Sequence, residues 1–320
     1  MRAERIVLTG ATGYIGSAVL RELAGRHRGA GGTAPHLTAV ARRPPVDEGL
    51  ADTWSTADLS RPDTLRGLCE GADTLLHLAC ALGPDTATCT AVNVRGTAAL
   101  MREARRAGVR RIVHLSTAAV YGPGPHDGAD VAELVPAPAS PASCTRLAGE
   151  QHALAAGATV LRPGLVLGAG DRWVVPALAE LIARVPARWD GGRGRLSVIG
   201  VTDLARLIAA LAQDAPTTPR GVFHASHPEP VRNADLMAAL AVHGVLPAAD
   251  RDLSWDQCLD QLRATRGRVS ERQFGLLARD HWYRSDQIWD IARRTLERDP
   301  LHFLAGAAHW YRTQTAVLRA

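Results

Sequence analysis

The stretch Thr9-Gly10-Ala11-Thr12-Gly13-Tyr14-Ile15-Gly16-Ser17 decides how the rest of the chain is interpreted. It follows the apolar run 6–8, which predicts a strand, and leads into residues 18–24, which predict an amphipathic helix. A strand, a glycine turn and a helix in this order are the context of a dinucleotide-binding loop, although an ordinary tight turn has the same order. The first glycine permits the turn, the second lets the backbone approach a pyrophosphate, and the third lets the helix pack close to the strand. The cofactor contacts predicted here are Gly10, Thr12, Gly13, Tyr14, Ile15 and Gly16.

The composition is that of a globular protein. The chain has 320 residues, of which 46% are hydrophobic, enough for one large α/β domain or two smaller ones. It contains neither an apolar run of about 18 residues nor the pattern of a signal peptide. The five cysteines show no paired metal-ligand spacing, so we expect reduced thiols in a cytoplasmic protein and no metal site. The net charge of +5 comes from scattered arginines, and lysine is absent, so neither nucleic acid nor a membrane is an expected partner.

Strands and helices alternate through the first half of the chain. This alternation predicts a Rossmann-type α/β fold, a doubly wound parallel sheet whose ligands bind beyond the carboxyl ends of the strands. From Asp171 the pattern becomes mostly helical, with two further strand-like runs. We expect residues 1–170 to form a cofactor-binding domain to which 196–224 returns, and 171–195 with 225–320 to form a smaller, mostly helical substrate domain. The predicted strands are 6–8, 37–41, 74–79, 111–117, 159–164, 196–199 and 221–224.

The second predicted strand ends in Arg42-Arg43. In sites that prefer NAD, an acidic side chain near this strand accepts hydrogen bonds from the adenosine ribose. Guanidinium groups suit a 2′-phosphate instead, so the sequence favours NADPH as the cofactor, with NADH as the other possibility. The alternative explanation is that the two arginines are surface charges that bind no ligand.

Further motifs continue the pattern of the glycine loop. They are Asp58-Leu59, His77-Leu78-Ala79, Asn93-Val94-Arg95-Gly96-Thr97, Ser116-Thr117-Ala118-Ala119-Val120-Tyr121-Gly122, Leu161-Arg162-Pro163-Gly164, Val201-Thr202-Asp203-Leu204-Ala205 and His309-Trp310-Tyr311-Arg312. Together they resemble the extended short-chain dehydrogenases/reductases, the NAD-dependent epimerase/dehydratase family, over nearly the whole chain. The resemblance implies that Asp58 and Leu59 touch the adenine. It also implies that Leu78, Ala79 and Cys80 line the cofactor channel, and that Pro163, Gly164 and Leu165 face the nicotinamide; Asn93 and Arg146 complete the expected contacts. We expect a small-molecule substrate and a monomer or homodimer.

The acid/base pair of that family, Tyr-x-x-x-Lys, is missing. A glutamate follows the lysine by four residues in the family, and Glu150 with its preceding Leu-Ala-Gly fixes the alignment. Ala142 therefore stands at the tyrosine position and Arg146 at the lysine position, while Thr117 remains as the usual Ser/Thr partner. In the family the tyrosine donates a proton to the nascent alkoxide, and the lysine lowers the tyrosine pKa and holds the nicotinamide ribose. Arg146 could bond the ribose, but a permanently charged guanidinium is a poor proton relay.

Two interpretations of this change remain open. In the first, the protein is a reductase whose proton comes from Ser116, Thr117, Ser143, a water or the substrate itself. A phenol beside the ketone would support the developing oxyanion, and losing one acid/base group costs only about 10²–10⁴-fold in rate. We favour this interpretation: an NADPH-dependent ketoreductase of a polycyclic aromatic polyketide in antibiotic biosynthesis, similar to the angucyclinone ketoreductases that lack the Tyr/Lys pair. A nucleotide-sugar 4-ketoreductase is the alternative enzyme, and the second interpretation is a non-catalytic, NADP(H)-sensing regulator.

Four residues are candidate substrate contacts. His126 lies in a glycine-rich stretch after Tyr121, close to the expected site, and Tyr121 occupies a family position that is usually structural. Six of the seven tryptophans fall in the second half, where most should be packing residues. Trp173 and Trp189 are the two that we expect near a pocket for a flat aromatic substrate.

Overall fold

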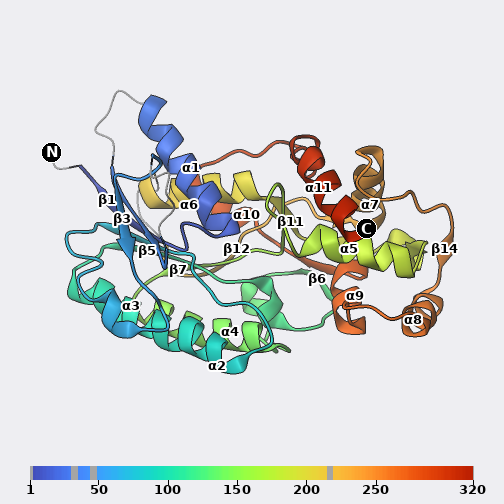
Figure 1. The fold of residues 1–320 in the computed structure, drawn as a ribbon, viewed down its shortest axis with the longest axis horizontal. Helices are drawn as coiled ribbons and strands as arrows, with labels where there is room; N and C mark the ends of the chain where they lie inside the picture. The colour runs from blue at the N-terminus through green and yellow to red at the C-terminus, as the bar shows by residue number, and fades with distance from the viewer. Residues whose placement is uncertain (1–2, 30–34, 44–48, 215–218, 320) are drawn as a thin grey trace.

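The computed structural model describes residues 3–29, 35–43, 49–214 and 219–319. Its centre is a seven-stranded sheet in the order β12-β7-β5-β4-β1-β2-β3, in which every neighbouring pair is parallel (Figure 1). This confirms the predicted Rossmann-type α/β fold. The strands of this sheet are β1 (Arg5–Thr9), β2 (His36–Ala41), β3 (Thr53–Thr56), β4 (Thr74–His77), β5 (Arg111–Leu115), β7 (Thr159–Arg162) and β12 (Gly221–His224).

Helices cover both faces of the sheet because successive strand side chains point to opposite sides. In β1, Ile6 and Leu8 pack with the buried residues of α1 and α6, whereas Val7 packs with those of α3 and α4. Figure 1 shows these two layers above and below the strands. The helices on the first face are α1 (Tyr14–Gly29), α6 (Val201–Gln213) and α10 (Asp286–Ala292), and those on the second are α2 (Thr86–Cys89), α3 (Thr97–Arg106) and α4 (Pro141–Ala155).

The predicted strand 196–199 is wrong as a single strand of the main sheet. The chain forms two short strands there, because Ser197 turns between two partners: its N–H donates to His281 O (3.0 Å) and its carbonyl accepts from Leu165 N (2.8 Å). Neither short strand joins the seven-stranded sheet, whereas β12 does. The strands outside that sheet are β6 (His126–Ala129), β8 (Leu165–Leu167), β9 (Arg188–Trp189), β10 (Arg195–Leu196), β11 (Val198–Gly200), β13 (Val231–Arg232), β14 (Asp252–Leu253) and β15 (His281–Tyr283).

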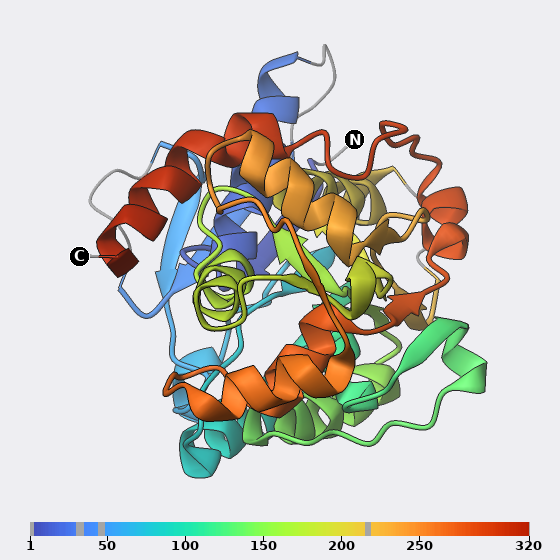
Figure 2. The same cartoon turned by 90° about the vertical axis from the view of Figure 1, so that its right-hand side faces the viewer.

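The second half of the chain builds a helical region with a core of its own, seen from its own side in Figure 2. Leu178, Leu240, Phe274 and Tyr311 are buried in this core and come from four different helices. This region stands beside the carboxyl ends of the sheet strands, where a substrate would meet a cofactor. Its helices are α5 (Val174–Arg184), α7 (Asn233–Val242), α8 (Trp255–Ala264), α9 (Glu271–Ala278) and α11 (Leu304–Arg319).

Candidate functional site

The glycine loop between β1 and α1 has no room for a side chain at Gly10 or Gly16. A Cβ on Gly16 would stand 2.0 Å from the carbonyl oxygen of Gly10, and a Cβ on Gly10 would stand 2.7 Å from the backbone nitrogen of Ala79. Gly10 also has φ +77°, which favours glycine. Thr12 and Gly13 at the tip are exposed. A phosphate could therefore approach the backbone at the N-terminus of α1, as a dinucleotide loop requires.

The glycine loop is joined to the C-terminal region by a clasp formed by Tyr14, Gly168, Asp171 and Tyr311. The Tyr311 hydroxyl accepts the Gly168 N–H (2.7 Å) and donates to Asp171 Oδ2 (3.2 Å), while the Tyr14 hydroxyl reaches Gly168 O at 3.5 Å. Burial, followed by the Asp171 carboxylate, raises the pKa of both tyrosines, which keeps them protonated donors. Asp171 also accepts backbone N–H groups of residues 173–175 at the start of α5. Tyr14 was expected only as a cofactor contact, and no sequence pattern predicted the clasp.

The arginines at the end of β2 are exposed and lie beside the first predicted adenine contact. Arg42 is among the charges that lower the pKa of the Asp58 carboxyl, after two hydrogen bonds from Ser60. The Ser60 N–H and hydroxyl donate to Asp58 Oδ1 at 2.9 and 2.7 Å. Arg42 and Arg43 are thus free of the core and able to meet a ligand at this edge. Residues 44–48, which follow them, lie outside the described residues.

The predicted channel wall after β4 is held by a buried amide. Asn93 Oδ1 accepts the Ala81 N–H (2.7 Å), and Nδ2 donates to Ala81 O (2.9 Å) and to Thr145 Oγ1 (3.0 Å). Leu78 is buried and Cys80 is exposed on the same segment. Asn93 therefore shapes the channel from behind, because its amide is already bonded to protein. Leu59 contributes packing: its backbone oxygen lies 2.5 Å from where a Cβ of Gly96 would stand.

The nicotinamide end of the expected site is framed by backbone hydrogen bonds and by Arg146. Pro163 O accepts the Ala118 N–H (2.9 Å), and Gly164 N–H donates to Ser226 Oγ (2.9 Å). Arg146 Nη2 donates to Leu115 O (3.0 Å), at the end of β5. Its Nε is buried and has no partner in the described part of the chain. An arginine with an unused buried donor is suited to a ribose hydroxyl.

The three proton-donor candidates differ in what their hydroxyls already do. Ser116 donates to Glu150 Oε1 and is fully buried. The Ser143 hydroxyl is bonded to the backbone of Ser140 at the start of α4 and is also buried. The structure therefore contradicts their expected role, because both are committed to the fold. Thr117 Oγ1 accepts the Ala119 N–H (3.2 Å) at a half-buried position, which leaves its hydroxyl hydrogen available.

Ser116 belongs to a buried polar chain that includes Tyr121. The Arg162 guanidinium is bonded to the Glu150 carboxylate and donates through Nη1 to the Tyr121 hydroxyl (2.8 Å). That hydroxyl lies 2.8 Å from His224 Nε2. Tyr121 is only 2% exposed, so the structure places it in the fold rather than in contact with a substrate. The bonded partners are 12 to 103 residues apart in sequence, and no local sequence pattern predicts them.

Two of the other substrate candidates are also corrected. Trp189 is fully buried, stacks edge-on against Phe274 and donates its ring N–H to Val185 O (2.9 Å), so it is a core residue. His126, expected in a glycine-rich stretch near the site, lies in the strand β6 with its ring against Tyr121 and Tyr283. Trp173 is accessible to a substrate, as expected, since 65% of its surface is exposed at the start of α5.

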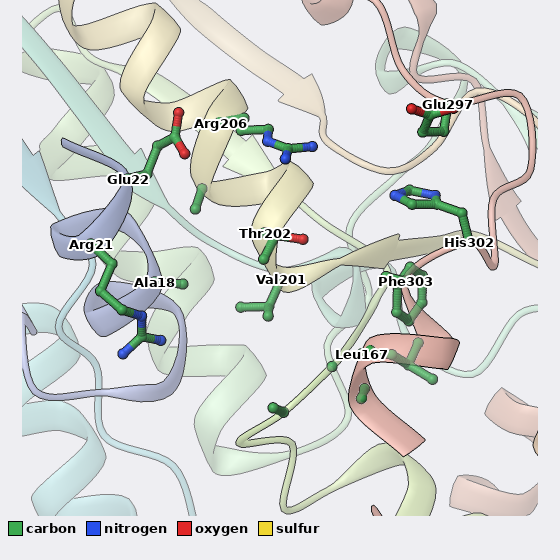
Figure 3. Close-up of a pocket in the computed structure, with 15 residues that line it drawn as sticks. Ala18, Arg21, Glu22, Leu167, Val201, Thr202, Arg206, Glu297, His302 and Phe303 are labelled. Carbon is green, nitrogen blue, oxygen red and sulfur yellow. The ribbon is translucent and has the colours of Figure 1, made fainter. Parts of the chain in front are cut away.

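A separate cavity of about 640 Å³ lies among α1, α6 and the start of α11 (Figure 3). Arg21 and Glu22 line it from α1, Arg206 from α6, and His302 with Phe303 from the segment before α11. None of the residues lining it was predicted as a site residue. Gly168, which the Tyr14 hydroxyl reaches, is among its lining residues, whereas no residue of the stretch 9–17 is.

No membrane-crossing helix and no metal cluster is found within the described residues. None of the helices there is long and apolar enough to cross a membrane. No group of three or more His, Cys, Asp or Glu residues in the same part of the chain is placed to hold a metal ion. All five cysteines are free thiols.

The fold and the glycine loop are those of a dinucleotide-binding α/β protein. The family model for the NAD dependent epimerase/dehydratase family matches residues 6–223, and the chain belongs to this family. This confirms the resemblance to the extended short-chain dehydrogenases/reductases. The nicotinamide dinucleotide that the family implies fits the residues present, because Gly10 and Gly16 stand where a Cβ would collide with backbone and Arg146 Nε offers a buried donor.

Several relatives are named as reductases. The chain is similar to the dTDP-4-dehydrorhamnose reductase of Mycobacterium tuberculosis, with 31% identity over 88% of this chain and 90% of the relative. It is also similar to the 4-hydroxy-2-methyl-3-oxo-4-farnesyl-3,4-dihydroquinoline-1-oxide ketoreductase of Stigmatella aurantiaca, with 30% identity over 66% of this chain. The match covers only 65% of the length of that relative, and a further relative is also matched over only 66% of its own length. These names support the predicted NAD(P)-dependent oxidoreductase.

The solved structures agree on the fold. A short-chain dehydrogenase/reductase superfamily protein from Agrobacterium tumefaciens with bound NAD matches 99% of both chains, with a TM-score of 0.73 and 23% identity. Identity at this level supports the shared architecture and says nothing about the substrate.

Proposed function

We propose that the protein is an NADPH-dependent ketoreductase that reduces a ketone of a polycyclic aromatic polyketide, as in antibiotic biosynthesis. The proposal is supported by an intact glycine loop together with Ala142 on α4, the residue that the Glu150 alignment sets at the family's tyrosine position. Ala142 and Arg146 are one turn apart on α4, so they share a face of that helix. A bound nicotinamide supplies the hydride, and reduction then depends on how the chain orients the ketone and where the proton originates.

The chain offers one modest donor to the ketone oxygen. Thr117 can direct its hydroxyl at the developing oxyanion, whereas Ser116 and Ser143 are bonded elsewhere. Arg146 holds the ribose and adds positive charge without releasing a proton. A substrate that carries a phenol next to its ketone brings its own hydrogen bond to the oxyanion. An aromatic polyketide has such groups, so its reduction suffers least from Ala142.

Exposed apolar side chains support a flat aromatic substrate. Leu82 is 51% exposed after β4, and Trp173 is 65% exposed beside the clasp. The Stigmatella relative is named for a ring ketone on a dihydroquinoline. We also propose that the protein acts in the cytoplasm, where its thiols stay reduced, as a monomer or homodimer.

A nucleotide-sugar 4-ketoreductase is the second candidate. It is favoured by the match to a dTDP-4-dehydrorhamnose reductase over 88% of the chain. A sugar ketone lacks a phenol to support its oxyanion, so a missing tyrosine should slow its reduction more.

The test uses NADPH deuterated at nicotinamide C4. The protein is incubated with this cofactor and either a polycyclic hydroxy-ketone or a dTDP-4-keto sugar, and the products are analysed by mass spectrometry. Deuterium at the new carbinol carbon of the polycyclic product supports the proposal. Label only in the sugar product establishes the second candidate, and cofactor binding without transfer to either indicates a non-catalytic regulator.

Restoring the family's proton donor separates the two enzymes further. For a substrate with its own phenol, Ala142→Tyr should change kcat by less than about threefold, because a positioned acid adds little to an existing hydrogen bond. For a ketone without that phenol, the gain should approach the 10²–10⁴-fold typical of general acids. Ala142→Phe is the matched control, since it adds the same ring without a hydroxyl. A large gain with the polycyclic ketone would show that proton donation limits its turnover.

A further inference from the structure

Two histidines lie side by side on the neighbouring strands β4 and β5. His77 and His114 are register partners on β4 and β5, and their rings stack with centroids 4.9 Å apart. His77 is bonded on both nitrogens, to Thr9 Oγ1 (2.8 Å) and Thr97 Oγ1 (2.9 Å). These bonds fix the His77 ring, and its stacking holds the ring of His114 in turn.

His114 carries a buried nitrogen that no described residue bonds. The residue is 6% exposed, and its Nδ1 has no partner in the described part of the chain. Burial, followed by the charges of His77 and Arg146, holds the pKa of His114 well below its usual range. The ring is therefore neutral. A neutral imidazole carries its proton on one nitrogen and accepts with the other, so a buried Nδ1 without a partner in the described part of the chain can serve as an acceptor.

Arg146 provides the complementary group on the neighbouring helix. Its Nη2 donates to Leu115 O, the residue after His114, which places the guanidinium over the end of β5. Its Nε is buried without a described partner, and its charge reaches both histidines. A buried donor on α4 and a buried ring nitrogen on β5 are therefore both without a partner among the described residues, and Arg146 is bonded to the residue next to His114.

We propose that His114 Nδ1 and Arg146 Nε together bind one hydroxyl group. A hydroxyl can accept the Nε–H of Arg146 and donate its own hydrogen to Nδ1 of His114, which satisfies both buried atoms at once. The hydroxyl belongs either to an ordered water or to the ribose of the dinucleotide. The second source rests on the proposed cofactor binding, whereas the pair itself is a property of the cofactor-free chain. His114 is then a positioning residue that sets the plane of the Arg146 guanidinium.

The experiment is a double-mutant cycle with His114→Phe and Arg146→Lys. Phenylalanine keeps the ring on His77 without the acceptor, and lysine keeps the charge without Nε–H. Urea unfolding of the cofactor-free protein measures one cycle, and NADP⁺ affinity measured by fluorescence gives the other. We expect the two substitutions to be coupled by a factor of about ten in either the unfolding or the NADP⁺-binding equilibrium. This is the range of a hydrogen bond to a charged group. His114→Asn, which places an amide near Nδ1, should recover most of the loss.

The equilibrium that shows the coupling identifies the source of the hydroxyl. Coupling in urea unfolding indicates an ordered water, and coupling only in NADP⁺ affinity indicates the ribose. Additive losses in both equilibria, or no recovery with asparagine, would overturn the proposal. Should His114→Phe fail to fold, the ¹⁵N shift of His114 Nδ1 in Arg146→Lys decides, since it must move if the two groups share a ligand. Absence of NADP⁺ binding in the unaltered protein would refute the proposed function, but not a coupling seen in unfolding.

Discussion

At the scale of single residues, the cofactor choice depends on the two arginines after β2. Arg42 is exposed and close enough to Asp58 to lower the pKa of its carboxyl, and Arg43 is exposed beside it. A guanidinium that meets a 2′-phosphate contributes a charge-assisted hydrogen bond, worth about 1.5–3 kcal/mol. Asp58 already has two donors from Ser60, so Arg42 is not needed to hold it.

We therefore expect Arg42→Ala to lower the preference for NADPH over NADH by about 10- to 100-fold. The ratio of the dissociation constants of the two cofactors is the measurement. Arg66→Ala is the matched control, because Arg66 is 84% exposed and paired with Asp63 on the surface. An unchanged ratio in Arg42→Ala, with the double variant Arg42→Ala/Arg43→Ala also unchanged, would contradict the assignment of the 2′-phosphate to this edge.

At the scale of elements, the turn from β1 to α1 is set by a close backbone contact. A methyl group on Gly16 would lie 2.0 Å from Gly10 O, so the start of α1 must move away from β1. Gly16→Ala should weaken dinucleotide binding by more than tenfold and lower the free energy of unfolding by about 1–3 kcal/mol, the usual cost of overpacking. Cofactor fluorescence and urea unfolding measure the two effects.

Gly25→Ala provides the control within the same helix. A Cβ there meets nothing within 4 Å, and alanine is the better helix former by about 1 kcal/mol. This variant should be slightly more stable and bind the cofactor normally. Wild-type affinity in Gly16→Ala would show that the loop tolerates the displacement, and that the glycine loop does not depend on this contact.

The elements also show what a sequence can and cannot predict. The glycine loop and six of the seven strands of the main sheet were predicted, because periodicity and turn residues act locally, whereas β3 was missed. Ser116 and Tyr121 were misjudged because their partners, Glu150 and Arg162, come from distant elements. Trp189 was misjudged for the same reason, since only the folded chain brings it to Phe274. Side-chain partners across the fold decide between a buried network and a site, and no local pattern carries that information.

At the scale of the whole molecule, stability should depend on buried histidines. Burial lowers the pKa of both His77 and His224 to about 4, and that of His114 falls well below its usual range. In the unfolded chain each histidine titrates near 6.5, so below that pH the unfolded state binds more protons than the folded state. The stabilisation is complete above pH 6.5 and is lost as the pH falls from 6.5 toward 4.

Each such histidine contributes about 1.4 kcal/mol per pH unit within that window, so the free energy of unfolding should fall by several kcal/mol between pH 6.5 and 5. Urea unfolding at half-unit intervals down to pH 5 measures the slope above the range where most carboxylates titrate. His77→Gln should flatten this slope whatever its effect at pH 7, because it removes one group that titrates only when the fold opens. His152→Asn, at an exposed position on α4, should leave the slope unchanged. A flat profile in the unaltered protein would mean that these rings admit protons without unfolding, which their burial argues against.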